Sequence, residues 1–188
     1  MDFTPDLENC LNTLRNGGLI LYPTDTIWGI GCDATDAAAV QKIYALKKRP
    51  ETKSLIVLLA NEKDLLRYVT QPDLQVLDYL RTVNKPTTVI YKDPVGLADN
   101  IISADGTIAI RIVKEEFCRH LIKRFRKPIV STSANFSGQA APANFDEIAP
   151  GIKQGVDYIV SYRQDDKTPK ESSAVIKWEK GAITVLRS

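Results

Sequence analysis

Short apolar runs alternate with amphipathic segments along most of this chain, and this alternation restricts the fold more than any other feature. Segments whose apolar residues recur at helical spacing predict helices at 4–16, 35–48, 61–69, 72–83, 114–126 and 144–149. Short apolar or β-branched runs predict strands at 19–22, 55–60, 87–91, 107–113, 129–132, 158–161, 173–177 and 183–186. Because helices and strands alternate and the chain closes on a strand pair, the sequence predicts an α/β fold with a mixed parallel and antiparallel sheet.

The length and the charge balance limit how the chain is organised. Its 188 residues match one ordinary domain, and no repeat or linker divides them, so we expect a single domain over residues 1–188. The formal net charge of +2 allows a nucleic-acid contact only as a local patch. The longest apolar run, residues 55–60, is far shorter than the roughly 20 residues that span a bilayer. The first residues also lack the order of a secretory signal, so a cytoplasmic location is expected.

Cysteine and histidine are too sparse to predict a metal site or a histidine-based mechanism. Cys10, Cys32 and Cys118 are odd in number and form no C-x-x-C pair, which disfavours both a disulfide framework and a zinc site. His120 is the only histidine, and it lies in an amphipathic stretch where a position on the helix surface is the simpler interpretation. A Ser-His-Asp or Cys-His mechanism is therefore poorly supported.

Two segments near the first predicted strand offer groups that bind anions. Residues 22–31 begin where a buried strand ends, and open α/β sheets place ligand crevices at such ends. A Pro-initiated turn with locally satisfied hydroxyls is the alternative. Lys47 continues the apolar face of helix 35–48, so its ammonium should emerge at the sheet edge, where it suits a phosphate or a carboxylate. For Lys47 and Arg49 the alternative is a favourable contact with the helix dipole.

The predicted strand 107–113 carries an arginine between apolar neighbours. The isoleucines of this strand share one face, which leaves the other face to Thr107, Ala109 and Arg111. A buried arginine needs a partner, and a structural salt bridge is one interpretation. A ligand is the other, since the alanine leaves space between the two polar side chains.

The densest group of hydrogen-bonding side chains lies at 128–138, which reads Pro-Ile-Val-Ser-Thr-Ser-Ala-Asn-Phe-Ser-Gly. Such a loop can hold phosphates through hydroxyls, an amide and backbone N–H groups. Neither the P-loop sequence nor the Rossmann fingerprint occurs. The residues by themselves therefore predict an anion-binding cleft in an α/β protein, and no more.

Four of these motifs, in this order, resemble those of the YrdC/Sua5/TsaC family of threonylcarbamoyl-AMP synthases. They are Tyr-Pro-Thr-Asp-Thr at 22–26, Lys-x-Arg at 47–49, Gly-Thr-Ile-Ala-Ile-Arg at 106–111 and Ser-Thr-Ser-Ala-Asn-x-Ser-Gly at 131–138. The resemblance runs over nearly the whole chain. It implies an open, twisted sheet with flanking helices, of the YrdC/RibB-like type. It also implies the short, TsaC-like form without the C-terminal domain of the longer Sua5 type.

The resemblance further implies the ligands and the residues that bind them. Family members make threonylcarbamoyl-AMP and pyrophosphate from L-threonine, bicarbonate and ATP with Mg²⁺, and a transferase then moves the threonylcarbamoyl group to adenosine 37 of tRNA. The residues expected to bind ATP are Lys47, Arg49, Thr107, Ser133, Asn135 and Arg187, and the first two are also expected to be catalytic. The residues expected to bind threonine are Thr24, Thr26, Arg111, Ser131 and Ser173. The metal is expected to arrive with ATP and not to be held by protein side chains.

The chain departs from the family pattern at the expected rim of the pocket. Trp28 replaces the usual tyrosine, Lys85 stands where a glycine is common, and Glu171 stands where proline is frequent. The charged segment 164–171 is expected to be mobile and to supply a closing motion over the ligands.

Two other functions fit parts of the same pattern. One is a module that binds double-stranded RNA or tRNA, which is recognised largely by shape, although the near-neutral charge weighs against it. The other is transfer of a simple carbamoyl group, as in the related domain of hydrogenase-maturation proteins, which zinc fingers accompany. Because the motifs supply cations and hydroxyls but no evident nucleophile, we expect catalysis by positioning and charge stabilisation.

Overall fold

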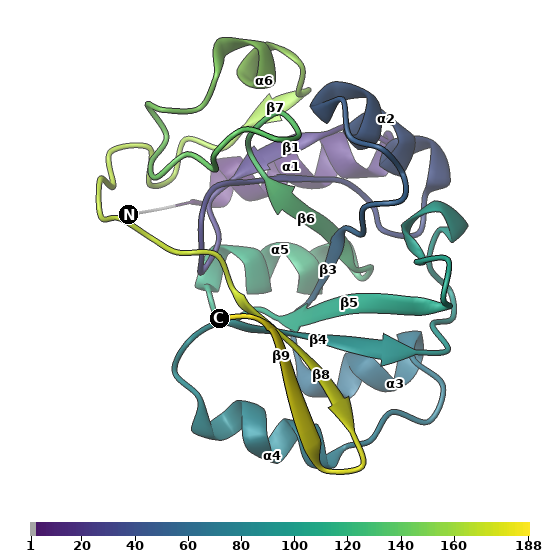
Figure 1. Ribbon diagram of the computed structural model, residues 1–188. Coiled ribbons are helices and arrows are strands. Elements are labelled where there is room, and N and C mark those ends of the chain that lie inside the picture. The colour runs from purple at the N-terminus through teal and green to yellow at the C-terminus, as the bar shows by residue number, and fades with distance from the viewer. Residues whose placement is uncertain (1–2) are drawn as a thin grey trace.

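The computed structural model describes residues 3–188 and places their strands in one mixed sheet of nine strands (Figure 1). The strands are β1 (Ile20–Tyr22), β2 (Gly29–Gly31), β3 (Ile56–Leu59), β4 (Thr87–Lys92), β5 (Thr107–Ile112), β6 (Ile129–Ser133), β7 (Tyr158–Ile159), β8 (Ala174–Glu179) and β9 (Ala182–Arg187). The helices are α1 (Thr4–Arg15), α2 (Ala37–Lys47), α3 (Leu65–Tyr68), α4 (Gln75–Thr82), α5 (Glu116–Phe125) and α6 (Pro150–Gln154), with 3₁₀ turns η1 (Glu62–Asp64) and η2 (Asp99–Ile101). The predicted fold class is confirmed.

The order of strands across the sheet is β7-β1-β2-β6-β3-β5-β4-β8-β9. The pairs β7–β1, β3–β5 and β4–β8 are parallel, and the other neighbours are antiparallel. Strand β6 joins the two halves, because Ile129 and Ser131 pair with β3 while Ser133 pairs with Gly29 of β2. The polar end of β6 therefore lies inside the sheet and not at its edge.

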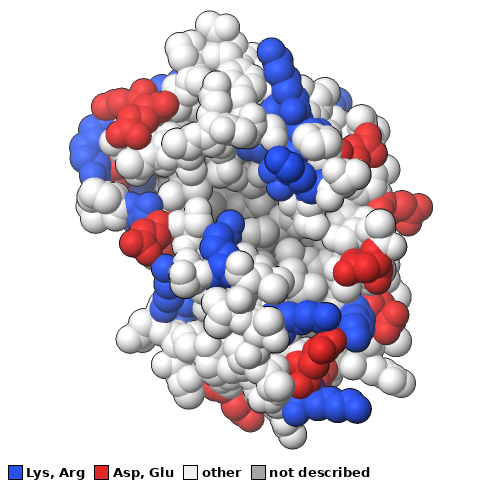
Figure 2. Space-filling view, viewed as in Figure 1, with Lys and Arg blue, Asp and Glu red and all other residues white. Residues whose placement is uncertain are grey.

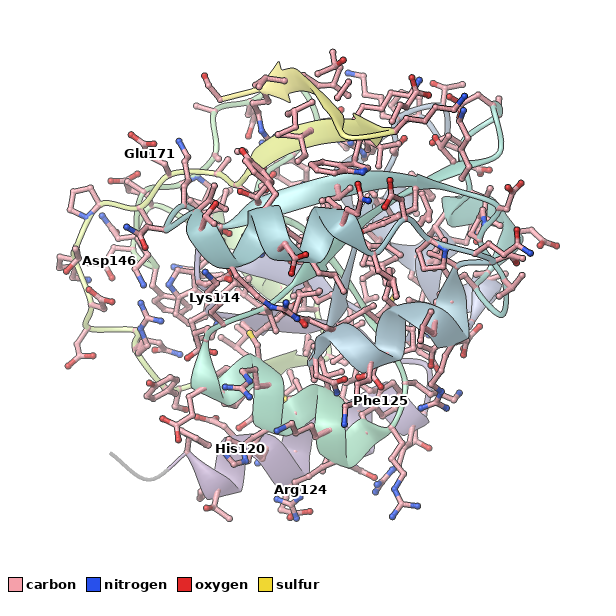
Figure 3. All side chains as sticks on the ribbon, turned by 90° about the horizontal axis from the view of Figure 1, so that it is seen from below. Lys114, His120, Arg124, Phe125, Asp146 and Glu171 are labelled. Carbon is pink, nitrogen blue, oxygen red and sulfur yellow. The ribbon has the colours of Figure 1, made fainter. Side chains whose placement is uncertain are left out.

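Helices cover both faces of the sheet. α1 and α5 lie side by side against one face (Figure 3), and their apolar residues share a buried cluster with Leu58 and Ile129. α2, α3 and α4 contribute to a second cluster, which holds Val57 and Ile110. Since Val57 and Leu58 are neighbours in one strand, the two clusters lie on opposite faces. No helix within residues 3–188 is long and apolar enough to cross a membrane.

Strand β2 lies in the segment 22–31, in which the sequence analysis predicts no strand. β1, β2 and β6 approach one another so closely here that only glycine fits. A Cβ atom on Gly31 would lie 2.6 Å from Cε1 of Tyr22 and 2.8 Å from the carbonyl oxygen of Val130. Glycine is disfavoured in strands in general, and this packing requirement is invisible in the local sequence.

The helix predicted at 144–149 is also wrong, because turns occupy those residues and α6 starts at Pro150. The side-chain oxygen of Asn144 accepts hydrogen bonds from the backbone N of Asp146 at 3.1 Å and of Glu147 at 3.4 Å, as a helix-capping side chain does, but the chain forms only a turn there. The proline ring disfavours the helical conformation at Ala149, whose ψ is 137°. Proline at the first helical position then favours the start of α6.

Candidate active site

A cavity of about 270 Å³ lies where β4, β5, β6 and the segment before β8 present polar side chains to one face of the sheet. This face also carries α1 and α5. Ser131 lines the cavity and Ile129 belongs to the cluster of these helices, and the two side chains share a face because they are two residues apart on β6. Figure 2 shows a hollow bordered by basic side chains. The described residues that line the cavity include no carboxylate but three arginines and many hydroxyls: Arg49, Arg111, Arg187, Thr26, Ser54, Thr88, Ser131, Thr132, Ser133, Ser172 and Ser173. Such a lining suits anionic ligands.

The segment after β1 forms a tight turn that its own threonines hold. The hydroxyl of Thr24 accepts a hydrogen bond from the backbone N of Thr26 at 3.0 Å and donates to the carbonyl of Ile27 at 2.8 Å. The turn interpretation is therefore correct for Thr24, which is buried and does not line the main cavity. Thr26 does line it. Of the two threonine-binding candidates in this segment, only Thr26 lines the main cavity, and Thr24 holds the turn.

Lys47 is buried beneath the loop that follows β6. Its ammonium donates to the carbonyl oxygens of Ser133 and Asn135, the second at 2.5 Å, and the residue is 1% exposed. Burial lowers the pKa of Lys47 to about 7, and the nearby charge of Arg49 acts in the same direction. The predicted place of Lys47, away from open solvent, is confirmed, but Lys47 does not line the cavity. In this structure it supports the loop that carries Ser133.

Neutral acceptors anchor two of the lining arginines. Arg49 donates to the carbonyl oxygens of Lys53 at 3.2 Å and Ser54 at 2.8 Å. Arg187 donates to the carbonyl oxygen of Ser173 at 3.0 Å and to its Oγ at 3.2 Å. Burial lowers the pKa of both guanidinium groups. Because carbonyls and hydroxyls orient a guanidinium without cancelling its charge, both arginines keep that charge for an anion.

The third lining arginine, Arg111, has a carboxylate partner. Its Nη2 lies 3.1 Å from Oδ1 of Asp25, and both side chains are buried. The salt-bridge interpretation of Arg111 is therefore correct. The ligand interpretation is compatible with it, because Arg111 also lines the cavity beside Ala109 and Ser131.

The hydroxyl-rich segment 131–138 has two parts: the end of β6 lines the cavity, and the loop that follows is held by its own hydrogen bonds. Ser131 and Ser133 line the cavity. The side-chain amide of Asn135 instead donates to the carbonyl oxygens of Phe136 at 3.1 Å and Gln139 at 2.7 Å. Asn135 therefore closes the loop and does not line the cavity.

Thr107 lies apart from the other candidates. It lines a second cavity, of about 530 Å³, and its hydroxyl donates to Oδ1 of Asp105 at 2.7 Å. Ile90 lines both cavities, so the two adjoin. The main cavity brings together the remaining predicted residues that reach it, which are Thr26, Arg49, Arg111, Ser131, Ser133, Ser173 and Arg187.

Sequence reasoning missed two contributors to the site. Thr88 lines the cavity, and its hydroxyl lies 2.9 Å from that of Ser173. The predicted strand places Thr88 on the face opposite to that of Val89, and this was a signal that could have found it. Asp25 stands in the Tyr-Pro-Thr-Asp-Thr motif but was given no role. The need of Arg111 for a partner pointed to some carboxylate, although no local pattern could say which one.

The three departures from the family pattern have structural explanations. Trp28 is buried, and its ring lies 4.9 Å from that of Phe145. Lys85 pairs with Glu171 at 2.8 Å, so the two charged departures contact each other. This pair ties the end of the segment 164–171 to the turn that precedes β4.

None of the thiols and imidazoles of residues 3–188 lines the main cavity. The three cysteines are free and buried, and burial raises the pKa of each thiol. His120 is exposed on α5 (Figure 3). Within the described part of the chain, no group of three or more His, Cys, Asp or Glu side chains is placed to hold a metal ion.

Comparison with known proteins agrees with this geometry. A family model described as Sua5/YciO/YrdC, telomere recombination, matches residues 12–188. The threonylcarbamoyl-AMP synthase of Idiomarina loihiensis is 34% identical over 146 residues, which are 76% of this chain and 78% of that protein.

Two solved structures show the same fold. A double variant of P. abyssi Sua5 has a TM-score of 0.84 at 25% identity, over 96% of this chain and 55% of its own, so this chain spans about half of that one. E. coli YciO has a TM-score of 0.83 at 20% identity, over 98% of this chain and 89% of its own, and shows likeness of fold alone. From the match of the family model and the identity to the curated relative, the chain belongs to the Sua5/YciO/YrdC family.

Proposed function

We propose that the chain is a threonylcarbamoyl-AMP synthase, which makes threonylcarbamoyl-AMP and pyrophosphate from L-threonine, bicarbonate and ATP. The observation that carries the proposal is the main cavity, whose described lining holds three arginines and many hydroxyls without a carboxylate. All three substrates carry negative charge, so a site with surplus positive charge attracts them together. Curated relatives that bear this enzyme's name support the proposal.

The geometry suggests how ATP and threonine share the cavity. Arg49 and Arg187, which keep their full charge, suit the phosphates of ATP, and Ser133 lines the same cavity. Lys47 and Asn135 hold the loop that follows Ser133. The adjoining second cavity leaves room for the rest of the nucleotide, where Thr107 would reach it.

Threonine would lie next to the phosphates in the same cavity, because Arg187 donates a hydrogen bond to Ser173. A planar carboxylate matches the parallel N–H donors of Arg111. Ser131, Thr26 and Ser173 line the cavity around it and would bind the remaining polar groups of threonine. Thr24 contributes indirectly, by fixing the turn that carries Thr26.

The proposed reaction needs no covalent bond to the enzyme. The amine of threonine condenses with bicarbonate to a carbamate and releases water. An oxygen of the carbamate then attacks the α-phosphorus of ATP, and the bond to the bridging oxygen breaks as pyrophosphate leaves. Arg49 and Arg187 would stabilise the charge on the phosphates, so catalysis rests on positioning and electrostatics. By its chemistry this is a nucleotidyl transfer.

Mg²⁺ would enter as the ATP complex, where it neutralises phosphate charge. The lining of the main cavity offers hydroxyl oxygens to such a complex and, among the residues described, no carboxylate. This donor set fits a metal that the phosphates hold. The product is a reactive mixed anhydride, so we further propose that a transferase consumes it in the cytoplasm and modifies adenosine 37 of tRNA.

Pyrophosphate release tests the proposal. The purified chain is incubated with ATP, Mg²⁺ and bicarbonate, with and without L-threonine, and pyrophosphate is measured. We expect release that depends on both threonine and bicarbonate. Equal release without threonine would contradict the proposal, whereas release that needs an added carbamoyl donor in place of threonine would favour simple carbamoyl transfer. No release, together with tight and strongly salt-dependent binding of RNA, would favour the RNA-binding module.

A further inference from the structure

Asp25 is a buried carboxylate that contacts an arginine of the main cavity. Within residues 3–188, Arg111 is the one lining arginine with a carboxylate at ion-pair distance, 3.1 Å from Nη2 to Oδ1 of Asp25. The other oxygen of Asp25 accepts a hydrogen bond from the backbone N of Lys114 at 3.2 Å, just ahead of α5. The side chains of Arg111 and Asp25 are 3% and 9% exposed. Asp25 is therefore anchored at one end and holds Arg111 at the other.

The protein leaves this ion pair incompletely satisfied. Nε of Arg111 and Oδ1 of Asp25 are buried and have no hydrogen-bond partner among the described residues, so the two charges meet without a hydrogen bond to Oδ1. Arg111 lines the cavity, and its guanidinium donates no hydrogen bond to any described residue. A ligand in the cavity can therefore supply acceptors for this group.

The three lining arginines differ in how much charge they offer. Arg49 and Arg187 are held by carbonyl and hydroxyl oxygens and keep a full positive charge. Arg111 is partly compensated by Asp25. A triphosphate, with several negative charges, is drawn more strongly to the uncompensated pair. A single carboxylate gains its affinity from the planar donor geometry that Arg111 retains.

We propose that Asp25 is a positioning residue that makes Arg111 the carboxylate-selective subsite of the cavity. Asp25 fixes the orientation of the guanidinium and lowers its attraction for phosphate, so that the amino acid and the nucleotide do not compete for one cation. This inference rests on the proposed function, since the carboxylate in question is that of threonine.

The test uses Asp25→Asn, which keeps the shape of the side chain and an acceptor for the backbone N of Lys114 but removes the charge. We expect the KM for L-threonine to rise about 10-fold, which corresponds to about 1.4 kcal/mol, because Arg111 loses its orientation and ATP then competes with threonine for it. The KM for ATP should stay within about twofold, since Arg49 and Arg187 hold its phosphates. L-Threoninol, which lacks the carboxylate, serves as a competitive inhibitor. The preference of the enzyme for threonine over threoninol should fall by the same factor, a change that a merely structural role would not produce.

Asp33→Asn is the matched control. Asp33 is also a buried aspartate, accepts a hydrogen bond from the backbone N of Thr35 at 2.8 Å and pairs with Lys127 at 2.6 Å, but it does not line the main cavity. Both variants should lose comparable stability in urea, and only Asp25→Asn should change the KM for threonine.

The outcomes separate this inference from the proposed function. If the wild-type chain shows threonine-dependent turnover and Asp25→Asn leaves the KM for threonine unchanged, raises both KM values equally or behaves as Asp33→Asn does, the role of Asp25 is overturned. If the wild-type chain shows no threonine-dependent turnover, the proposed function fails, and the role of Asp25 fails with it.

Discussion

At the scale of single residues, the most unusual group is the ammonium of Lys47. It is almost wholly buried and contacts the neutral carbonyl oxygens of Ser133 and Asn135. The hydrogen bonds favour the charged form, whereas removal from water disfavours it, and the second effect is the larger because the pKa falls to about 7. The loop that presents Ser133 to the cavity therefore depends on a lysine that is close to losing its charge at neutral pH.

This leads to a prediction about stability and pH for Lys47→Met. Because the pKa of Lys47 in the folded chain, about 7, lies below its ordinary value of 10.5, the unfolded chain binds the proton more tightly. Between these values the free energy of unfolding of the wild type should rise with pH relative to that of the variant. Below about 7 both states are protonated, so the difference between the two proteins should be constant.

Urea unfolding of both proteins at several pH values between about 6 and 10 measures this difference. Lys63→Met, at an exposed lysine, is the control and should show no such trend. A difference between wild type and Lys47→Met that does not change with pH, or that favours the variant as pH rises, would contradict the burial of a titrating Lys47.

Sequence patterns predicted where the charged residues of the site lie, but they did not predict which residues those charged residues contact. The helical spacing placed Lys47 at the sheet edge, and strand alternation placed Arg111 on the face opposite the isoleucines, as the structure shows. The acceptors of Lys47 and the partner of Arg111 come from distant parts of the chain. Local periodicity carries no information about such pairings.

At the scale of elements, the packing of β1, β2 and β6 depends on glycine. A side chain at Gly31 would meet Tyr22 on one side and the carbonyl of Val130 on the other. The backbone of β6 cannot move away without disturbing Ser131 and Ser133, which line the cavity. The close packing around Gly31 therefore lies beside the site.

We predict that Gly31→Ala is strongly destabilising. The added Cβ would lie 2.6 Å from a ring carbon and 2.8 Å from a backbone oxygen, so the cost should be about 3 kcal/mol, at the upper end for overpacking. Urea unfolding checks this value. Gly106→Asn is the control, because Gly106 has φ +74° and open space around it. Asparagine adopts this conformation more readily than other residues, so a smaller loss of about 1 kcal/mol is expected. Equal losses in the two variants would show that close approach is not the reason for Gly31.

Elements with local signals were predicted well, and those fixed by tertiary packing were not. Asp36 caps α2 by accepting from the backbone N of Ala38 at 2.9 Å and of Ala39 at 3.2 Å, and the predicted helix 35–48 surrounds the observed one. β2 was missed because its glycines are explained only by neighbouring strands. The predicted helix 144–149 lies too early in the chain, because Pro150 disfavours the helical conformation at Ala149 and α6 starts only at Pro150.

At the scale of the whole molecule, positive charge is concentrated at the main cavity although the chain as a whole is nearly neutral. The net charge is only +2, yet three arginines face one cavity whose described lining has no carboxylate. Of the two cores, the one beneath α1 and α5 continues along the same sheet face into that cavity. The strands thus form the floor of the cavity, and β4, β6 and the segment before β8 supply most of its hydroxyls. The alternation of helices and strands predicted this architecture, whereas the order of strands required the structure.

The identity of the reaction product tests the central claim most directly. The chain is incubated with ATP, Mg²⁺, isotopically labelled bicarbonate and isotopically labelled L-threonine, and the nucleotide product is analysed by mass spectrometry. The account predicts one adenylate that contains both labels, formed together with pyrophosphate. An adenylate that carries the bicarbonate label without threonine, or ADP and phosphate in place of an adenylate, would contradict it.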